Sequence, residues 1–388
     1  MKKKFLRLYL IFAGFLFTCF TFFLISCEPE SNNGDVDKIV PIDWDNVGFE
    51  ISTGLNIGGW LSQTSTRNQA PEIFFTRSDV RNLAKWGFDH IRLPVDEHEM
   101  FSVEGEWNAK TLNLIHNAIG WCKDQNLRVM LDFHILRSHY FNDTENMTLW
   151  TNKDDQDKFI AMWQKISGEF SKYPNSLLAY ELLNEPVPPS PADWNNLSAR
   201  LITVLRELEP ERILVLDPSS HSSIGQLKNL TLPEGDSNIM LSVHFYTPHL
   251  LTHYQAPWMD GLKNLSIPLH YPGQLVAQED FDTITIPRHK DVVRYYNGYY
   301  DKSVLQARLQ EAINFGIQTG LQIHVGEIGC IDKTPVDVRR NWYSDVISIF
   351  KENNIAFSIW GYKSNFGILN EFGTPKDKDL IEIITNKN

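Results

Sequence analysis

The chain has 388 residues, of which 42% are hydrophobic, 12% aromatic and 22% charged, and this composition excludes a disordered or fibrous protein. The formal net charge of −12 at pH 7 disfavours binding to phosphate backbones, so we expect no nucleic-acid partner. The length allows one or two folded domains.

Residues 1–26 are predicted to be a lipoprotein signal peptide. Basic residues precede an uncharged apolar run that ends at Ile25, which is the pattern of a targeting segment. The run closes with the sequence LISC, which resembles a bacterial lipobox and makes Cys27 the expected lipidation site. The alternative is a plain membrane anchor. Either way, we expect the body to be tethered outside the cytoplasm. The preferred interpretation is a location in the cell envelope, with the membrane contacted through an N-terminal lipid.

Residues 27–41 are polar and lack an apolar period, so they are predicted to be a flexible tether. Beyond Cys27, Cys122 and Cys330 are the two remaining cysteines, and a single possible pair makes no disulfide framework. The core of the domain at 42–388 must therefore supply its stability.

Short apolar runs alternate with amphipathic stretches from residue 51 onward. Expected strands lie at 53–58, 88–93, 127–133, 177–183, 212–217, 239–246, 321–327 and 355–360. Expected helices lie at 77–86, 109–125, 155–172, 193–208, 221–229, 303–319, 337–353 and 376–386. Apolar strands that are each followed by a helix indicate a parallel sheet. We predict an α/β fold, a (β/α)8 TIM barrel in a single domain, with an open doubly wound sheet as the alternative.

One connection, 247–302, is much longer than the others and is rich in His, Tyr, Trp and Pro. A long aromatic loop after a barrel strand belongs more often to an active-site rim than to a second domain. We therefore expect it to border the site.

Polar residues occur at the carboxyl end of almost every predicted strand, where TIM barrels carry their chemistry. These residues are Arg92, His134, Asn184, Glu185, His244, Tyr246, Glu327 and Trp360. Each one alone could be an ordinary surface or rim residue. Their shared position predicts that they meet at one mouth of the barrel.

Glu185 and Glu327 each follow an apolar strand, so both carboxyls are expected to be partly buried. The carboxyl beside Arg92 should stay ionised, while burial and its neighbour's charge should raise the pKa of the other. This division predicts the acid and the nucleophile of a retaining glycosidase, with carboxyls about 5 Å apart. The alternative is a structural pair that joins two strands.

At these residues the chain resembles glycoside hydrolase family 5. The matching segments are GFDHIRLPV (87–95), VMLDFH (129–134), LLNEP (182–186), VHFYTP (243–248), HVGEIG (324–329) and FSIWGYKSNFGILN (357–370). They follow one another in the family's order along nearly the whole domain. Residues 244–258 are similar to a segment of bacterial endo-acting β-1,4-glucanases, some of which also cut mannan.

The resemblance implies a role for each matching residue. Glu185 would be the general acid and base, and Glu327 the nucleophile. Asn184 would bind the sugar 2-hydroxyl, while Arg92 and Tyr246 would orient Glu327. His134 and His244 would complete a polar wall, and Trp360 would form an apolar floor under the sugar.

Trp60 and Trp258 are candidate platforms for further sugars, although each could equally be a packing residue. Two positions depart from the family pattern. Ile135 stands where a second His or a Trp is common, and Gly361 stands where Asp or Glu is common. Both departures bear on substrate choice more than on the reaction.

We therefore expect a monomeric glycosidase that acts on β-1,4-glucan without a metal or organic cofactor. Endo-β-mannanase, xyloglucanase and β-1,3-glucanase are alternatives on the same scaffold. A metal-dependent hydrolase is another, because His249 and His253 are four residues apart and His244 is near them in sequence. A glycan-binding lipoprotein without catalytic activity is the alternative from a different class.

Overall fold

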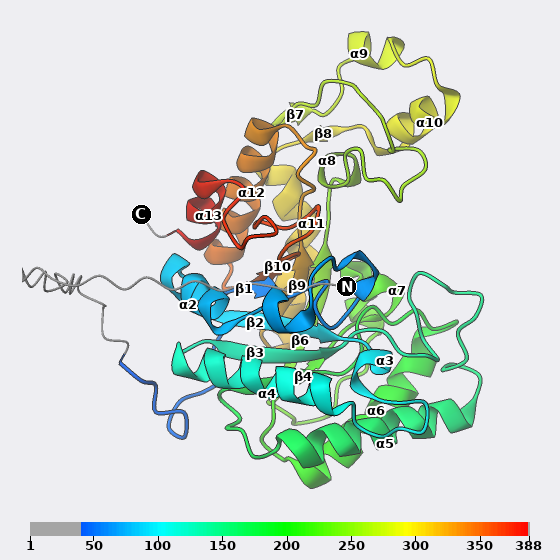
Figure 1. The fold of residues 1–388 in the computed structure, drawn as a ribbon. Coiled ribbons are helices and arrows are strands. Elements are labelled where there is room, and N and C mark those ends of the chain that lie inside the picture. Colours follow the sequence, from blue (N-terminus) through cyan, green and yellow to red (C-terminus); the bar gives the residue numbers. More distant parts are fainter. Residues whose placement is uncertain (1–39, 387–388) are drawn as a thin grey trace, which may run out of the picture. The chain divides into compact units, whose positions relative to one another are not determined.

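The computed structural model describes residues 40–386, and eight of their strands form a closed parallel barrel (Figure 1). The strand order around the barrel is β1-β10-β9-β6-β5-β4-β3-β2. The prediction of a (β/α)8 barrel is confirmed, and the open doubly wound sheet is excluded.

Each predicted strand is present, and each is shorter than or close to its expected length. The barrel strands are β1 (Thr53–Asn56), β2 (His90–Val95), β3 (Arg128–Phe133), β4 (Leu178–Glu181), β5 (Leu214–Leu216), β6 (Ile239–Phe245), β9 (Ile323–Ile328) and β10 (Ala356–Ile359). Nearly every residue in them is buried, because side chains fill the inside of the barrel and helices cover the outside.

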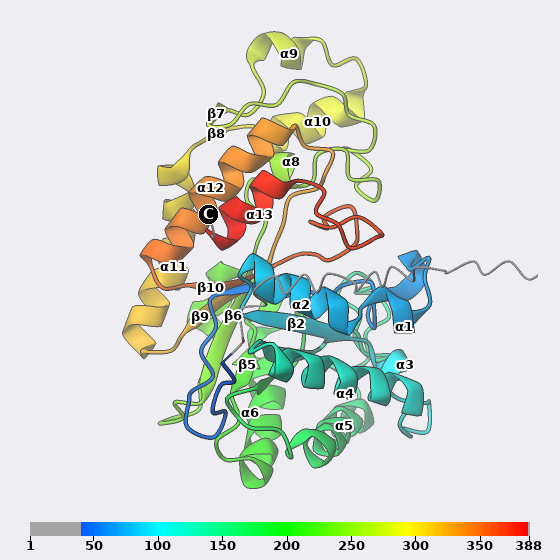
Figure 2. The same cartoon turned by 60° about the vertical axis from the view of Figure 1, so that its left-hand side comes forward.

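Seven of the eight predicted helices cover the barrel (Figure 2). They are α2 (Arg77–Trp86), α4 (Ala109–Asp124), α5 (Lys153–Phe170), α6 (Pro191–Leu208), α11 (Lys302–Thr319), α12 (Val336–Glu352) and α13 (Lys378–Thr385). Local chemistry sets several of their ends. Thr76 with Asp79 and Ser190 with Asp193 form capping boxes, and Gly320 ends α11 with φ of 70°.

The eighth predicted helix, at 221–229, is wrong as an α-helix. The chain first makes a left-handed turn in α7 (Ser219–Ser222), with φ of 58° at Ser220 and 59° at His221. A 3-10 helix, η2 (Ile224–Asn229), follows. Asp217 accepts a hydrogen bond from Ser222 at 2.7 Å, and this local bond competes with regular helix formation.

The long connection carries short helices and strands of its own, and it belongs to the same compact unit as the barrel. It carries α8 (His249–Thr252), α9 (Gln278–Asp282), α10 (Pro287–Tyr296) and a two-stranded sheet of β7 (Gly273–Gln274) and β8 (Tyr299–Tyr300). In Figure 1, α9 and α10 extend away from the barrel. Leu262, Leu275 and Val293 are buried and belong to the same apolar core as the barrel. The first turn of the connection lies beside the site, because His253 packs on Tyr246 with ring centroids 5.3 Å apart.

Near its start, the described chain is fixed by Asn126, which accepts a hydrogen bond from the Ile42 amide and donates one to the Val40 carbonyl. Cys27, the signal peptide and most of the tether lie outside the described residues. Cys122 and Cys330 are both buried and free. Within residues 40–386, no helix combines the length and apolarity needed to cross a bilayer.

Candidate active site

Arg92 is the centre of the polar interior at the carboxyl end of the barrel. Its fully buried guanidinium forms two hydrogen bonds with Glu181, from Nε at 2.7 Å and from Nη2 at 2.8 Å. Nη1 donates to Asn56 at 2.9 Å and to Glu327 at 3.1 Å. Nη2 also donates to Asn184 at 2.7 Å. Arg92, which lies on β2, therefore joins residues of β1, β4, β9 and the loop after β4.

Glu327 is turned into the site by a bulge between β6 and β9. The register shifts between Val243 and His244, so that His244 pairs with Glu327 rather than with Gly326. A bulge of this kind changes the direction of a side chain beside an active site. The Glu327 carboxylate accepts hydrogen bonds from Arg92 and, at 2.9 Å, from the Tyr246 hydroxyl. Both hydrogen bonds fix the direction of this carboxylate.

Glu185 follows β4 in a left-handed conformation, with φ of 46°. This conformation is unusual for a residue other than glycine, and such strain is found most often at functional sites. Its Oε1 lies 2.8 Å from His244 Nδ1, and its Oε2 lies 3.5 Å from His221 Nδ1. The left-handed turn at Ser220 and His221 brings this second histidine to the carboxylate.

The two histidines overturn the expected pKa of Glu185. Burial raises that pKa, but the hydrogen bonds and charges of His221 and His244 outweigh burial and hold it well below its usual range. Burial lowers the pKa of His244, but the charges of Glu327 and Glu185 outweigh burial and raise it to about 9. In the free protein, the proton of this pair therefore lies on His244.

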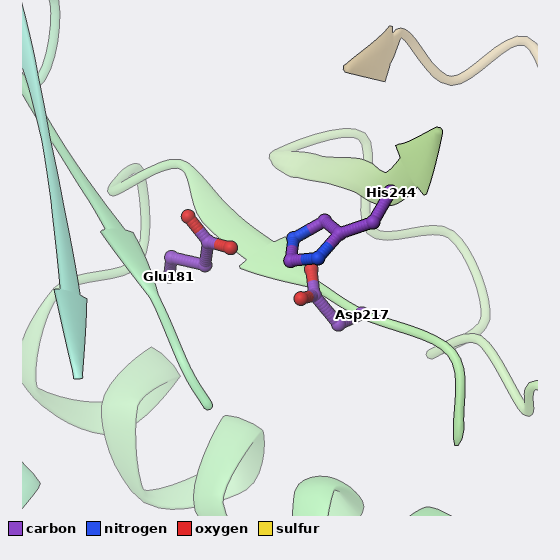
Figure 3. A group of neighbouring side chains, drawn as sticks. All are labelled: Glu181, Asp217 and His244. Carbon is purple, nitrogen blue, oxygen red and sulfur yellow. The ribbon is translucent and has the colours of Figure 1, made fainter. Parts of the chain in front are cut away.

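Two further carboxyls, those of Glu181 and Asp217, lie beside the His244 ring (Figure 3), and a third, that of Asp132, pairs with Arg92 at 3.0 Å. Glu181, Asp132 and Asp217 are almost completely inaccessible to solvent. Burial and the charge of Glu181 raise the pKa of Asp217 well above its usual range, and burial with Glu181 and Glu327 does the same for Asp132 although Arg92 opposes it. Both shifts favour the protonated form of these two carboxyls. The charged cluster consists of Arg92, Asp132, Glu181, Glu185, Asp217, His244 and Glu327.

The cluster contains two groups of three atoms that are close enough to face one cation. One oxygen each of Glu185 and Glu327 and one nitrogen of His244 lie within 4.8 Å of one another, and Glu181, Asp217 and His244 form a second such group. However, Arg92 already supplies the cation for Glu181 and Glu327. We assign no metal ligands here. His249 and His253 stack face to face, 4.9 Å apart, and belong to neither group, so the geometry does not support the predicted His-based zinc alternative.

His134 and Trp360 form one wall of the site. His134 Nδ1 lies 2.7 Å from Asp132, and its ring stacks on Trp360 with centroids 5.6 Å apart. A Cβ on Gly58 would lie 3.1 Å from the Trp360 ring, so the backbone that follows β1 packs closely against the indole. Asn184 is fully buried, and its Nδ2 has no hydrogen-bond partner among residues 40–386.

The structure distinguishes the two tryptophans that were predicted to be sugar platforms. Trp258 is 57% exposed and lies 5.8 Å from the Phe366 ring, on the part of the insertion nearest the site. Trp60 is completely buried and donates its Nε1–H to the Pro71 carbonyl at 2.7 Å. Because it packs against Phe75 and presents no open face, Trp60 is a core residue and its prediction as a sugar platform is wrong.

Several residues of the site were not predicted from the sequence. Glu181 and Asp217 stand at the ends of apolar strands. The argument that identified Glu185 from its position after a strand could also have identified these two residues. Asn56, at the end of β1, could have been identified in the same way. No sequence pattern pointed to His221, because its approach to Glu185 depends on the left-handed turn of α7.

Comparisons with known proteins agree with this geometry. The family model described as cellulase, glycosyl hydrolase family 5, matches residues 52–366. Endoglucanase C of Acetivibrio thermocellus is 31% identical over 343 residues, which are 87% of this chain and 98% of that protein. Cellodextrinase A of Ruminococcus flavefaciens is 24% identical over 87% of this chain and 94% of its own length.

Solved structures show the same fold. A crystal structure described as a glycoside hydrolase has a TM-score of 0.70 and 26% identity, and the match covers 87% of this chain and 99% of that one. Thermotoga maritima Cel5A, solved in complex with cellobiose, has a TM-score of 0.69 and 19% identity over 89% of this chain and all of that chain. With the catalytic geometry, the family match shows that the chain is a glycoside hydrolase and belongs to the cellulase family, glycosyl hydrolase family 5.

Proposed function

We propose that this glycoside hydrolase cleaves β-1,4-linked glucan with retention of configuration, using Glu327 as nucleophile and Glu185 as general acid and base. The observation that carries the proposal is the approach of oxygens from both carboxylates within 4.8 Å of each other. Carboxyls of retaining glycosidases are about 5–5.5 Å apart, whereas those of inverting enzymes are about 6.5–9.5 Å apart to admit a water molecule.

In the first step, a Glu327 oxygen attacks the anomeric carbon and forms an ester bond. The glycosidic C–O bond breaks, and the proton of Glu185 goes to the departing oxygen. Arg92 and Tyr246 hold Glu327 by hydrogen bonds at 3.1 and 2.9 Å and so fix the attacking carboxylate before substrate binds. The products of this step are a glycosyl ester on Glu327 and the shortened leaving chain.

In the second step, ionised Glu185 takes a proton from water, whose oxygen attacks the anomeric carbon. The ester bond to Glu327 breaks, and the carboxylate is regenerated. Two inversions at one carbon restore the β configuration. Glu185 must therefore lose its proton in the first step and regain one in the second.

Three residues have free groups that suit a sugar. The unpaired Nδ2 of Asn184 can donate to the 2-hydroxyl of the reacting sugar, a contact that strengthens in the transition state. Trp360 offers a partly exposed indole to the C–H face of a pyranose. Trp258 offers a second exposed indole farther along the chain of substrate.

The choice of β-1,4-glucan rests on the relatives. Those described as endoglucanase and cellodextrinase match the chain over almost their whole length. Mannan, xyloglucan and β-1,3-glucan stay as alternatives on the same catalytic groups, with less support than cellulosic substrates.

Lipid anchoring is a separate part of the proposal. The LISC sequence supports diacylation at Cys27, with residues 28–41 as the link between the lipid and a monomeric domain in the cell envelope. Metabolic labelling with a fatty acid tests this point. Incorporation into the natural chain and its loss in Cys27→Ala would support the anchor, whereas equal labelling of both would refute it.

The experiment for the activity incubates the domain from residue 36 onward with carboxymethylcellulose, mixed-linkage glucan, xyloglucan, glucomannan, mannan and laminarin. Glu327→Ala is the inactive variant, and Glu382→Gln on the exposed face of α13 is the matched control. We expect products from carboxymethylcellulose and mixed-linkage glucan with the natural chain and the control only. Products from mannan or laminarin alone would overturn the substrate, and binding without any product would favour the glycan-binding protein.

A further inference from the structure

His244 lies between the two catalytic carboxylates and the buried acids beneath them. Its Nδ1 is 2.8 Å from Glu185 Oε1 and 3.6 Å from Glu327 Oε2, so one N–H faces both carboxylates. The side chain is only 3% exposed.

The other ring nitrogen, Nε2, has no hydrogen-bond partner among residues 40–386. One oxygen each of Glu181 and Asp217 and one nitrogen of His244 lie within 4.8 Å of one another, and Figure 3 shows both carboxyls beside the ring. If Nε2 carried no proton, a buried lone pair would face carboxyl oxygens. A protonated Nε2 turns that repulsion into attraction.

The charges of the cluster also favour a protonated His244. If all five carboxyls were ionised and His244 were neutral, Arg92 would be the one cation against five buried negative charges. Burial lowers the pKa of His244, but the charges of Glu327 and Glu185 raise it overall, and burial raises the pKa values of Asp132 and Asp217. Each of these shifts reduces the excess of buried negative charge. Arg92 pairs with Glu181 and Glu327, and His244 lies beside Glu185.

We propose that His244 stores the acid proton between turnovers, and that this proton passes from its Nδ1 to Glu185 as the glycosidic bond breaks. The inference rests on the proposed roles of Glu185 and Glu327. It gives His244 a task that differs from lining the wall of the site, and it explains how a carboxylate that is ionised in the free protein can act as an acid.

The proton balance closes over one turnover. In the first step, Nδ1 gives its proton to Glu185 Oε1 across the 2.8 Å hydrogen bond, and Glu185 gives a proton to the leaving oxygen. Glu327 loses its charge when the ester forms, so the group that most strongly favours charged His244 is gone. His244 is then neutral and Glu185 is ionised, as the second step requires.

In the second step, Glu185 receives a proton from water while the ester breaks. The charge returns to Glu327, and the proton moves back from Glu185 to Nδ1. The net transfer is one proton from water to the leaving group, with His244 restored. Glu327 therefore controls the position of the proton through its charge.

Nitrogen NMR of histidine-labelled protein tests the proposal directly. The His244 signals are identified by their loss in His244→Asn, and their titration gives the charge of the ring. We expect a midpoint near pH 9 in the free protein. In Glu327→Gln, which mimics the uncharged ester, the midpoint should fall by at least about one pH unit, because a carboxylate charge near the ring is lost. A neutral His244 at pH 7 in the free protein, or an unchanged midpoint in Glu327→Gln, would overturn the proposal.

Asp217→Asn is the matched control, because the charge of Asp217 raises the pKa of His244 less than that of Glu327 does. We expect its midpoint to fall by less than that of Glu327→Gln. If the midpoint falls as far as in Glu327→Gln, a charge on Asp217 holds the proton, and the control by Glu327 is refuted.

A kinetic test separates proton storage from a structural role. His244→Asn should reduce the glycosylation rate at least about tenfold more for an aryl β-cellobioside with a poor leaving group than for a dinitrophenyl one, since only the former needs an acid. An equal loss for both substrates would show that His244 acts by position alone. Failure of the natural chain on every glucoside would refute the proposed function instead, while the NMR titration would still decide the state of His244.

Discussion

Arg92 and Glu181 form a buried ion pair with two hydrogen bonds, at 2.7 and 2.8 Å, inside the closed barrel. The same guanidinium contacts Glu327 at 3.1 Å, so the position of the nucleophile depends on an acid from a different strand. Glu181 is thus a positioning residue for a carboxylate that it does not touch.

Glu181→Gln should lower both stability and turnover. The change weakens two hydrogen bonds to a buried guanidinium, so we expect the free energy of unfolding to fall by about 2 kcal/mol. Denaturant titration measures this loss. Glu209→Gln is the control, because Glu209 forms a buried pair with Arg212, 2.7 Å apart, before the amino end of β5 and without contact to Arg92. It should lose stability but keep kcat per folded molecule; equal kcat in both variants would contradict the positioning role.

Gly326→Ala should impair the site by crowding. A Cβ at this position would lie 2.5 Å from Ser242 Oγ and 3.4 Å from His244 Nε2, so the neighbours must move. We expect kcat/KM to fall by at least about tenfold, because small displacements of catalytic groups are costly. Adding Ser242→Ala removes the closest atom and should restore part of the loss. If the double variant is no better than the single one, steric contact is not the cause.

Glu185→Gln should show a loss that depends on the leaving group. A glutamine cannot protonate the departing oxygen, so substrates with poor leaving groups should lose about 10²–10⁴-fold in rate. Dinitrophenyl β-cellobioside should lose much less in its first step. Rates across a series of aryl cellobiosides measure this slope, and a uniform loss would remove Glu185 from the role of acid.

Buried histidines should weaken the fold in acid. Burial lowers the pKa of His134 to about 4 and those of His139 and His253 to about 3, from an ordinary value of 6.5. The unfolded chain therefore binds more protons below pH 6.5, and stability falls as the pH decreases toward the folded values. Each histidine contributes a slope of about 1.4 kcal/mol per pH unit in this window.

His253→Phe keeps an aromatic ring but removes one of these titrations. Unfolding free energies at pH 6 and pH 4.5 should differ less in this variant than in the natural chain. Conversely, a variant with an undiminished difference would show that His253 is already charged in the folded state.

Trp258→Ala should affect long substrates selectively. Its exposed indole lies near the site through Phe366, so losing it should raise KM for cellopentaose without changing kcat for a short aryl cellobioside. Tyr295→Ala, on the distant α10 and 80% exposed, is the control and should change neither value. Similar KM values for Trp258→Ala and the control would reject the platform.

The sequence was sufficient to predict the barrel, because its strands are apolar almost throughout and the apolar residues of its helices recur with a clear helical period. It also predicted that Glu185 and Glu327 lie together, since polar residues at parallel strand ends converge wherever the sheet closes. The 221–229 helix failed because a side-chain hydrogen bond from Ser222 to Asp217 stabilises a left-handed turn there.

Other features depend on three-dimensional contacts that a linear pattern does not contain. The low pKa of Glu185 comes from His221 and His244, which approach from different strand ends. Trp60 follows β1 just as a rim residue would, yet its indole N–H finds the Pro71 carbonyl and the ring enters the core. The bulge at Gly326, which turns Glu327 toward His244, is likewise a property of strand pairing.

The stereochemistry of hydrolysis tests the central claim most directly. Proton NMR can follow the anomeric signals of cello-oligosaccharide products in the first minutes, before mutarotation mixes them. Attack by Glu327 and then by water at the same carbon predicts that the β-anomer appears first and the α-anomer follows slowly. Initial release of the α-anomer would mean a single displacement by water and would contradict the assignment of Glu327 as nucleophile.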